Sequence, residues 1–216
     1  MNRKLAFLDL LCYGAIPFLI WKYGREPLGD YWAILLSTAP AFIYTVYRFV
    51  KERQFNVLGL FIISSLLIST TVNLLSSSAE RMLWNQVFLG FGFASVYLFS
   101  MLIKKPLALY FAVDFAYLQG YPRNDSISLF KVKEIFMGFQ YITLLFALRN
   151  VFQNLLKMWL LTRYGADGYG QMIIYMTITG WVFSGLIMAG FYLNSVKINQ
   201  FLKTNMEESK RVESNK

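Results

Sequence analysis

The sequence predicts an all-α protein whose helices cross a membrane several times. Of its 216 residues, 56% are hydrophobic and only 15% are charged, whereas soluble domains carry about 25% charged residues. The mean hydropathy is +0.44, and the apolar residues are gathered in long runs. A helix needs about 20 apolar residues to cross a bilayer, so we expect a polytopic membrane protein.

Six apolar segments are long enough to predict six transmembrane helices, arranged as three hairpins. Within each hairpin the outer connection is short, and the first and last connections are rich in glycine, a turn residue. The spans belong to one predicted transmembrane domain (1–199), which is followed by a polar cytoplasmic tail (200–216) that we expect to be disordered. The predicted spans are residues 5–21, 31–47, 57–75, 83–103, 135–161 and 172–193.

The longest connection, residues 104–134, is predicted to carry a helix on the cytoplasmic membrane surface. It begins with Lys104, Lys105 and Pro106, and proline suits the first turn of a helix. The segment 107–118 is apolar and aromatic, with Asp114 as its only charge, and it is too short to span a bilayer. We expect an interfacial amphipathic helix here, with a re-entrant element that contributes to a pathway as the alternative.

The distribution of Lys and Arg predicts that both termini are cytoplasmic. Of the 21 basic residues, 15 fall at the termini and in the second-to-third and fourth-to-fifth connections, and four fall on the opposite side. Cytoplasmic loops carry this excess of positive charge, and aromatic belts form at the membrane interfaces. The net charge of +9 therefore favours anionic lipids as partners rather than nucleic acid. The tryptophans expected at outer ends of spans are Trp21, Trp32, Trp84 and Trp159.

The absence of histidine narrows the chemistry that this chain can perform. Histidine triads, imidazole proton relays and most zinc, copper and haem sites require that residue. Cys12 is the only cysteine, so no disulfide framework is available. No acid–base pair or nucleophile motif is visible either. We therefore expect no metal and no cofactor, and a protein that is not an enzyme.

A polar stripe in the fifth span is the strongest candidate for a binding site. Its members recur at helical spacing and share one side of a helix. A charge at that depth costs at least about 2.5–3.5 kcal/mol, so Arg149 should face protein or water. Two interpretations stay open: a cavity where the guanidinium binds a phosphate or carboxylate, or a closed polar seam between helices. Lys157 is expected to extend outward to the membrane surface. The stripe consists of Arg149, Asn150, Gln153, Asn154 and Lys157.

Two polar residues in other spans complete the candidate set. Asn73 shares a face of the third span with several serines and, like Arg149, is expected in the outer half of its span, so we expect it to partner the stripe. Asp9 lies about one turn inside the first span. We expect Asp9 to pair with a basic residue at the inner surface, with a proton-coupling role as the alternative.

Four features of the sequence together are similar to one known family. They are Asp9 followed by Pro17 in the first span, the basic loop Arg48-Phe-Val-Lys-Glu-Arg53, the segment Lys104-Lys105-Pro106-Leu107, and Leu148-Arg149-Asn150 at the place of an intramembrane Asn. This layout resembles the intracellular septation protein A family and its uncharacterised bacterial inner-membrane relatives. The resemblance implies a multi-pass protein of the bacterial cytoplasmic (inner) membrane that supports envelope maintenance or division, with no known catalytic residues.

Two classes of function follow from these observations. The first is a non-enzymatic membrane protein that acts through lipids, including anionic lipids of the cytoplasmic face, and through envelope or division proteins; a homo-oligomer stays open. The second is a small transporter, channel or lipid translocator. In that case an anionic group would be bound by Arg149, Asn150, Gln153, Asn154 and Asn73.

Overall fold

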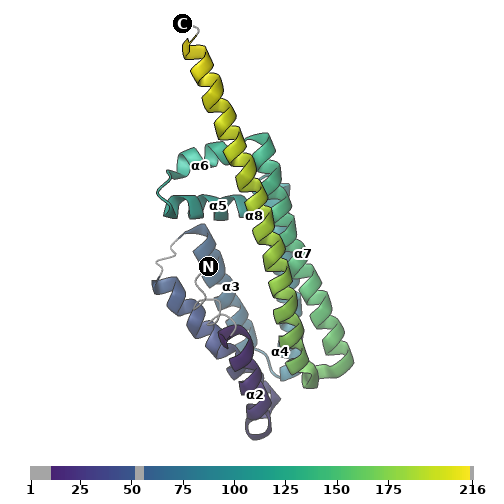
Figure 1. The fold of residues 1–216 in the computed structure, drawn as a ribbon. Helices are drawn as coiled ribbons and strands as arrows, with labels where there is room; N and C mark the ends of the chain where they lie inside the picture. Colours follow the sequence, from purple (N-terminus) through teal and green to yellow (C-terminus); the bar gives the residue numbers. More distant parts are fainter. Residues whose placement is uncertain (1–10, 52–55, 215–216) are drawn as a thin grey trace. The chain divides into compact units, whose positions relative to one another are not determined.

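The computed structural model describes residues 11–51 and 56–214, and within them the chain is almost entirely helical, with no strand. The prediction of an all-α fold is therefore confirmed for the described part of the chain (Figure 1). In chain order the elements are η1 (Leu11–Ala15), α2 (Ile16–Lys51), α3 (Val57–Leu74), α4 (Ala79–Leu102), α5 (Leu107–Leu118), α6 (Arg123–Phe130), α7 (Lys133–Tyr164), η2 (Gly165–Gly168) and α8 (Tyr169–Ser214).

Several helical segments are long and apolar enough to cross a membrane. Four continuous segments of the described chain meet this criterion by length and composition: Leu11–Lys51, Val57–Leu74, Ala79–Leu102 and Lys133–Asn205. The first joins η1 to α2, and the last joins α7, η2 and α8. Large apolar side chains are exposed on every one of these segments, as lipid-facing helices require.

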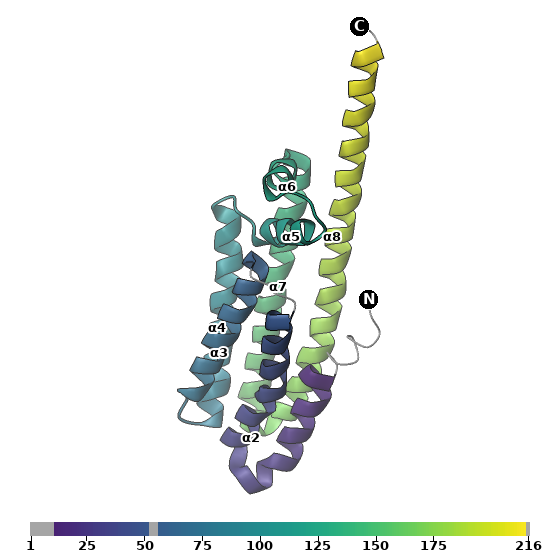
Figure 2. The ribbon, with the colours of Figure 1, turned by 90° about the vertical axis from the view of Figure 1, so that its left-hand side faces the viewer.

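Helix α2 contains a sharp reversal at Gly29. Gly29 has φ 76° and ψ 162°, a conformation that is essentially restricted to glycine. The chain turns back on itself there (Figure 2), and the hydroxyl groups of Tyr13 and Thr45 lie 2.6 Å apart. The two arms of α2 are therefore antiparallel neighbours, and the reversal falls within the turn expected at residues 22–30.

The chain divides into two compact units, which are described separately. The first contains the described residues up to 95 together with 148–182, and the second contains 96–147 together with 183–214. In the first unit, residues of α2, α4, α7 and α8 form one apolar core, against which Trp21 and Trp84 pack. The buried members of that core are Ile34, Ala79, Met82, Leu83, Leu160, Leu161, Tyr169 and Met172.

Short polar caps set where α3 and α4 begin. Asn56 precedes α3 in an extended conformation, and its side chain accepts a hydrogen bond of 2.7 Å from the backbone N–H of Gly59. Ser78 accepts a bond from the backbone N–H of Arg81 in the same way at the start of α4. Each cap satisfies an N–H that the helix itself leaves without a partner.

A tight turn joins α7 to α8 in the first unit. Gly165 ends α7 with φ 57°, the left-handed conformation that favours glycine at helix ends. A side chain at Gly170 would overlap the indole ring of Trp21. The glycine therefore lets α8 begin in contact with the first arm of α2. The buried hydroxyl of Tyr169 lies 3.0 Å from that of Ser37 and ties α8 to the second arm as well.

In the second unit, α5 and α6 form a hairpin that lies across the direction of α7 and α8 (Figures 1 and 2). The backbone N–H of Ala108 donates to Oγ1 of Thr143 at 3.2 Å and holds the start of α5 against α7. Helix α5 coincides with the helix expected at 107–118. The buried core of this unit consists of Ala108, Leu109, Val113, Phe130, Ile135, Phe139, Ile142 and Ile187.

Helices α7 and α8 approach closely at Gly138 in the second unit. A side chain there would overlap the amide of Asn194, which is 3% exposed. Neither amide atom of Asn194 has a hydrogen-bond partner among the described residues. Small residues allow such close contacts between membrane helices.

The tail after Gln200, expected to be disordered, is helical through Ser214 as the continuation of α8. Its sequence explains the difference. No glycine or proline follows Gly190, so nothing in this stretch breaks a helix that has already begun. The tail also contains three Glu and three Lys, together with one Met and one Arg, and these residues have high helix propensity.

Candidate functional site

The polar stripe of the fifth predicted span lies on α7 and divides between two neighbouring helices. Arg149 and Gln153 face α8: Nε2 of Gln153 donates to the backbone carbonyl of Met176 at 3.1 Å. Near them, a side chain at Gly180 would meet Gln153 at 3.4 Å and the guanidinium of Arg149 at 3.7 Å. Both are ordinary van der Waals distances, so α8 passes these two polar groups at a normal packing distance.

The other members of the stripe face α4 or their own helix. Asn154 is buried, and its Nδ2 donates to the backbone carbonyl of Asn150 at 2.7 Å. Its amide lies directly over Gly90 of α4, where a side chain would overlap it. Three residues further along α7, Nζ of Lys157 donates to Oε1 of Gln86 on α4. The stripe thus joins α7 to α8 on one side and to α4 on the other.

Lys157 and Gln86 belong to a hydrogen-bonded series that we call the polar chain: Lys157, Gln86, Asn73 and Tyr31. Nε2 of Gln86 donates to Oδ1 of Asn73 at 2.7 Å. The hydroxyl of Tyr31 reaches the backbone carbonyls of Asn73 at 3.4 Å and Leu74 at 3.3 Å. Beside this series, Nδ2 of Asn85 donates to the hydroxyl of Ser76 at 3.0 Å. The polar chain therefore links α7, α4, α3 and the second arm of α2.

The structure brings Asn73 to the stripe by a route that differs from the expected one. Asn73 reaches the stripe through Gln86 and Lys157. Lys157, expected to extend outward, instead turns to α4, because Gln86 offers an acceptor within the bundle. Gln86 and Tyr31 were not among the candidate residues. The polar pair Asn85-Gln86 within the otherwise apolar fourth span is the sequence signal that could have identified Gln86.

The serines that share a face with Asn73 bond mainly to their own helix. The hydroxyl of Ser65 donates to the carbonyl of Phe61 at 2.7 Å, and that of Ser69 donates to the carbonyl of Ser65 at 2.8 Å. Ser76 donates likewise to Val72. Such bonds satisfy a hydroxyl inside one helix, so this face of α3 offers small side chains for packing.

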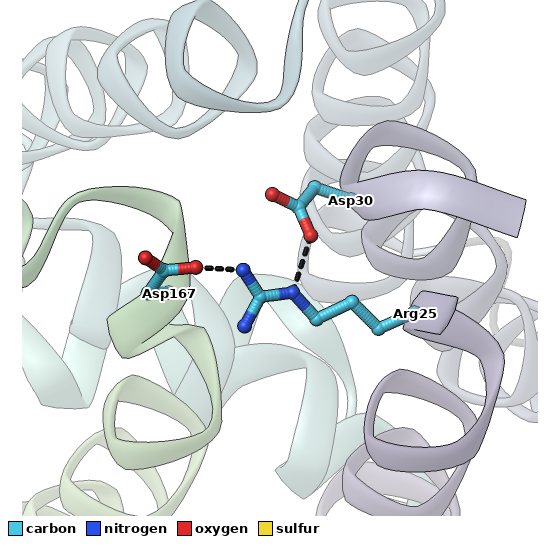
Figure 3. Close-up of polar contacts among 3 residues, drawn as sticks. All are labelled: Arg25, Asp30 and Asp167. Carbon is cyan, nitrogen blue, oxygen red and sulfur yellow. Dashed lines mark hydrogen bonds and ion pairs between the residues drawn. The ribbon is translucent and has the colours of Figure 1, made fainter.

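At one end of the first unit, Arg25 joins two connections (Figure 3). Its Nε bonds to Oδ1 of Asp30 at 2.5 Å, and its Nη2 pairs with Oδ1 of Asp167 in η2. The guanidinium also lies 5.8 Å from the ring of Trp21. We call Arg25, Asp30 and Asp167 the carboxylate clasp. It ties the reversal of α2 to the turn between α7 and α8.

Of the residues predicted to lie at the membrane surface, the two lysines are exposed and the aspartate is buried. Lys104 and Lys105 are exposed after the end of α4, and Lys104 has φ 57°, a left-handed conformation that is uncommon outside glycine. Asp114 is 2% exposed, and its Oδ1 lies 3.4 Å from Nη2 of Arg123. Asp9 lies outside the described residues.

The polar chain offers hydrogen bonding but no acid–base pair. Its one charged group, the ammonium of Lys157, is bonded to a neutral amide, and its other members are an amide and a phenol. An ammonium beside amides can attract an anion or hold helices together. Within residues 11–51 and 56–214, no group of three or more Cys, Asp or Glu side chains is arranged to hold a metal ion.

These features define an all-helical protein with several long apolar helices that are compatible with membrane spans and with polar groups bonded between helices. Comparison with protein-family models, with curated proteins and with solved structures gave no match.

Proposed function

We propose that this chain is a non-enzymatic membrane protein with six spans, which acts through lipid and protein partners. Two features support six spans rather than four. Gly29 reverses α2 so that its arms lie antiparallel, and η2 separates α7 from α8, whose residues Gln153 and Met176 are again in contact. Each continuous segment of this kind therefore provides two crossings.

The proposed orientation places both termini in the cytoplasm. The Arg25–Asp167 pair and the bonds from Tyr31 to the carbonyls at the end of α3 bring three connections to one end of the first unit. These connections carry few basic residues, and positive charge is enriched in cytoplasmic loops. The shared end is therefore the outer one.

The observation that carries the non-enzymatic proposal is the closed packing around the stripe. Lys157, Gln153 and Asn154 each have a protein acceptor. At Gly90, α4 lies so close to α7 that a side chain there would overlap the amide of Asn154, and Gly180 of α8 lies at ordinary packing distance from Arg149 and Gln153. A seam of this kind specifies how membrane helices pack. It also leaves the outward-facing surfaces to contact lipids and other proteins.

The proposed setting is the bacterial inner membrane, in envelope maintenance or division. It is supported by the resemblance to the septation protein A family at Asp9, at the basic loop around Arg48, at Lys104–Leu107 and at Arg149. Co-purification of the intact protein with division or wall-synthesis proteins, with no movement of solutes or lipids in reconstituted vesicles, is the expected outcome.

The second candidate is a small transporter, channel or lipid translocator that takes an anionic group. It is favoured by one observation: Arg149 and Lys157 place two cations on one helix within the predicted fifth span, and the ammonium of Lys157 is bonded to the amide of Gln86. Charged side chains inside membrane spans mark the pathways of ions and substrates.

Water access at position 149 separates the two candidates. In a Cys12→Ser background, Arg149→Cys is treated with a membrane-impermeant thiol reagent from either side. Ser77→Cys, exposed between α3 and α4, serves as the outer control, and Leu155→Cys, exposed on α7, serves as the lipid-facing control. The seam predicts labelling at 149 only after denaturation. Rapid labelling of the folded protein would refute the seam and favour the transporter.

A further inference from the structure

The hairpin of α5 and α6 has a buried base and an exposed apolar tip. At the base, Ala108, Leu109 and Val113 are buried in the core of the second unit. At the tip, the chain turns at Gly120, which has φ 95°, and four large apolar or aromatic side chains are 54–64% exposed. We call these four residues the aromatic tip: Phe115, Tyr117, Leu118 and Tyr121.

An ion pair and a cation–π contact stabilise the turn that carries the aromatic tip. The carboxylate of Asp114, 2% exposed, pairs with Arg123 from the start of α6. The guanidinium of Arg123 in turn lies 4.6 Å from the ring centre of Tyr117, within the range of a cation–π interaction. The ion pair and the ring contact therefore stabilise a turn at which the apolar side chains of the tip are exposed.

Contacts within the second unit set the level of this hairpin along α7. The rings of Tyr97 and Phe146 stack at 5.3 Å, and Nε2 of Gln140 reaches the carbonyl of Met101 at 3.4 Å. The apolar part of α4 therefore ends beside residues 140–146 of α7. Helix α5 starts at the same level, because Ala108 bonds to Thr143.

This level differs from the start of the fifth predicted span. Residues 135–161 were expected to cross the membrane, but exposed Lys104 and Lys105 follow the end of α4 and mark where hydrocarbon ends. The corresponding point on α7 is near Thr143, eight residues after Ile135, or about 12 Å of helix. If the proposed spans hold, the first two turns of α7 extend beyond the hydrocarbon, and α5 lies at its boundary.

We propose that the aromatic tip inserts into the cytoplasmic leaflet at the boundary between headgroups and acyl chains, and that the lysines around the hairpin bind anionic headgroups. The four exposed lysines of this region are Lys104, Lys105, Lys131 and Lys133, against two exposed acids, Asp125 and Glu134. Aromatic and apolar side chains beside basic ones are the chemistry of such interfaces. This proposal rests on the proposed membrane function.

The test measures the depth of nitroxide labels on the full-length protein in vesicles of phosphatidylcholine with or without phosphatidylglycerol. In a Cys12→Ser background, single cysteines are placed at Leu118 in the tip, at Ser128 on the exposed side of α6, and at Ile178, an exposed position of α8. With phosphatidylglycerol we expect the label at 118 to collide with oxygen and to be shielded from an aqueous nickel complex. The label at 128 should show the opposite pattern.

The controls separate failure of this proposal from failure of the proposed function. A label at 178 in lipid together with a label at 118 in water would overturn the insertion of the tip and leave the spans intact. A label at 178 in water would refute the membrane function itself. Shielding of 118 from both reagents would mean a protein partner or a second copy covers the tip, and would also overturn the proposal.

The lysines are tested by Lys104→Gln combined with Lys105→Gln. We expect the aqueous accessibility of the label at 118 to fall severalfold when phosphatidylglycerol is added, and this fall to be lost in the double variant. The same depth in both lipid mixtures, with and without the lysines, would contradict the choice of anionic headgroups as the ligand.

Discussion

The ammonium of Lys157 on α7 donates a hydrogen bond to the side-chain oxygen of Gln86 on α4. Its partner is an amide, so the attraction between unlike charges that stabilises an ion pair is missing. The amide of Gln86 is in turn oriented by its bond to Asn73. The position of a charged group among membrane helices thus depends on a neutral side chain that spans the distance between α7 and α3.

Gln86→Leu should destabilise the protein strongly, because it removes the acceptor for Lys157 and the donor for Asn73 together. Leaving a buried polar group without a partner costs about 1–3 kcal/mol, and more for a charge. We expect a corresponding fall in the free energy of unfolding measured by denaturant titration in detergent micelles. The matched comparison is Asn85→Leu, which removes one exposed amide next to Gln86.

Lys157→Met in the Gln86→Leu background should restore much of the loss. Replacing both partners of a polar contact by apolar groups of similar shape is often close to neutral. The double-mutant cycle then yields a coupling energy between positions 86 and 157. Additive effects of the two substitutions would show that the bond does not contribute to stability.

Gly90→Ala should be costly and Gly92→Ala nearly neutral, although the two glycines lie two residues apart on α4. A side chain at Gly90 would overlap the amide of buried Asn154, whereas nothing lies within 4 Å of one at Gly92. Overpacking costs about 1–3 kcal/mol. Thermal unfolding of both variants in micelles checks the difference. Equal midpoints would mean that α4 and α7 separate without cost at this point.

Gly29→Ala should destabilise the reversal of α2 by about 1–3 kcal/mol, because a side chain is strained at φ 76°. The space around Gly29 is open, so the cost comes from the backbone alone. Gly24→Ala in the same turn meets only ordinary contacts at 3.7 and 3.9 Å and should be tolerated. The rate of proteolytic cleavage in this turn, measured on each variant in reconstituted vesicles, checks the difference. Equal cleavage rates for the two variants would argue against a strained reversal.

Arg25→Gln should weaken the carboxylate clasp by at most about 1 kcal/mol. The pair is partly exposed, with side-chain exposures of 35% for Arg25, 36% for Asp30 and 72% for Asp167, and exposed ion pairs contribute about 0–1 kcal/mol. The loss should shrink as salt is added. Lys22→Gln makes the same charge change on an exposed residue of the same turn. A loss insensitive to salt would point to packing on Trp21 as the cause.

Hydropathy and glycine placement were sufficient to predict an all-helical chain with several long apolar helices and the helix at 107–118, because each depends on local sequence. The stripe on α7 was also visible as a periodic pattern. A periodic pattern gives angles about one helix axis, but it does not say which neighbour lies at each angle. For that reason the division of the stripe between α8, at Gly180, and α4, at Gln86, could not be derived from sequence.

The burial of Asp114 could not be predicted either, because the local sequence does not show which element packs against it. In the sequence it is a lone charge in an apolar helix, a pattern typical of a residue at a membrane surface. Its burial depends on α6 folding back so that Arg123, nine residues later, meets it. Likewise, the tail beyond Gln200 is polar, and polarity alone predicted disorder. The uninterrupted helix from Tyr169 to Ser214 provides a preformed end on which those residues continue as helix.

The length of α8 gives the protein a built-in spacer. Its 46 residues correspond to about 69 Å of helix, more than twice the roughly 30 Å of a bilayer's hydrocarbon core. With the proposed orientation, the 21 residues from Asn194 to Ser214 would hold the end of the described chain about 30 Å from the bilayer surface. A partner protein bound at that end would be held at a fixed distance from the membrane surface, beyond the lipid headgroups.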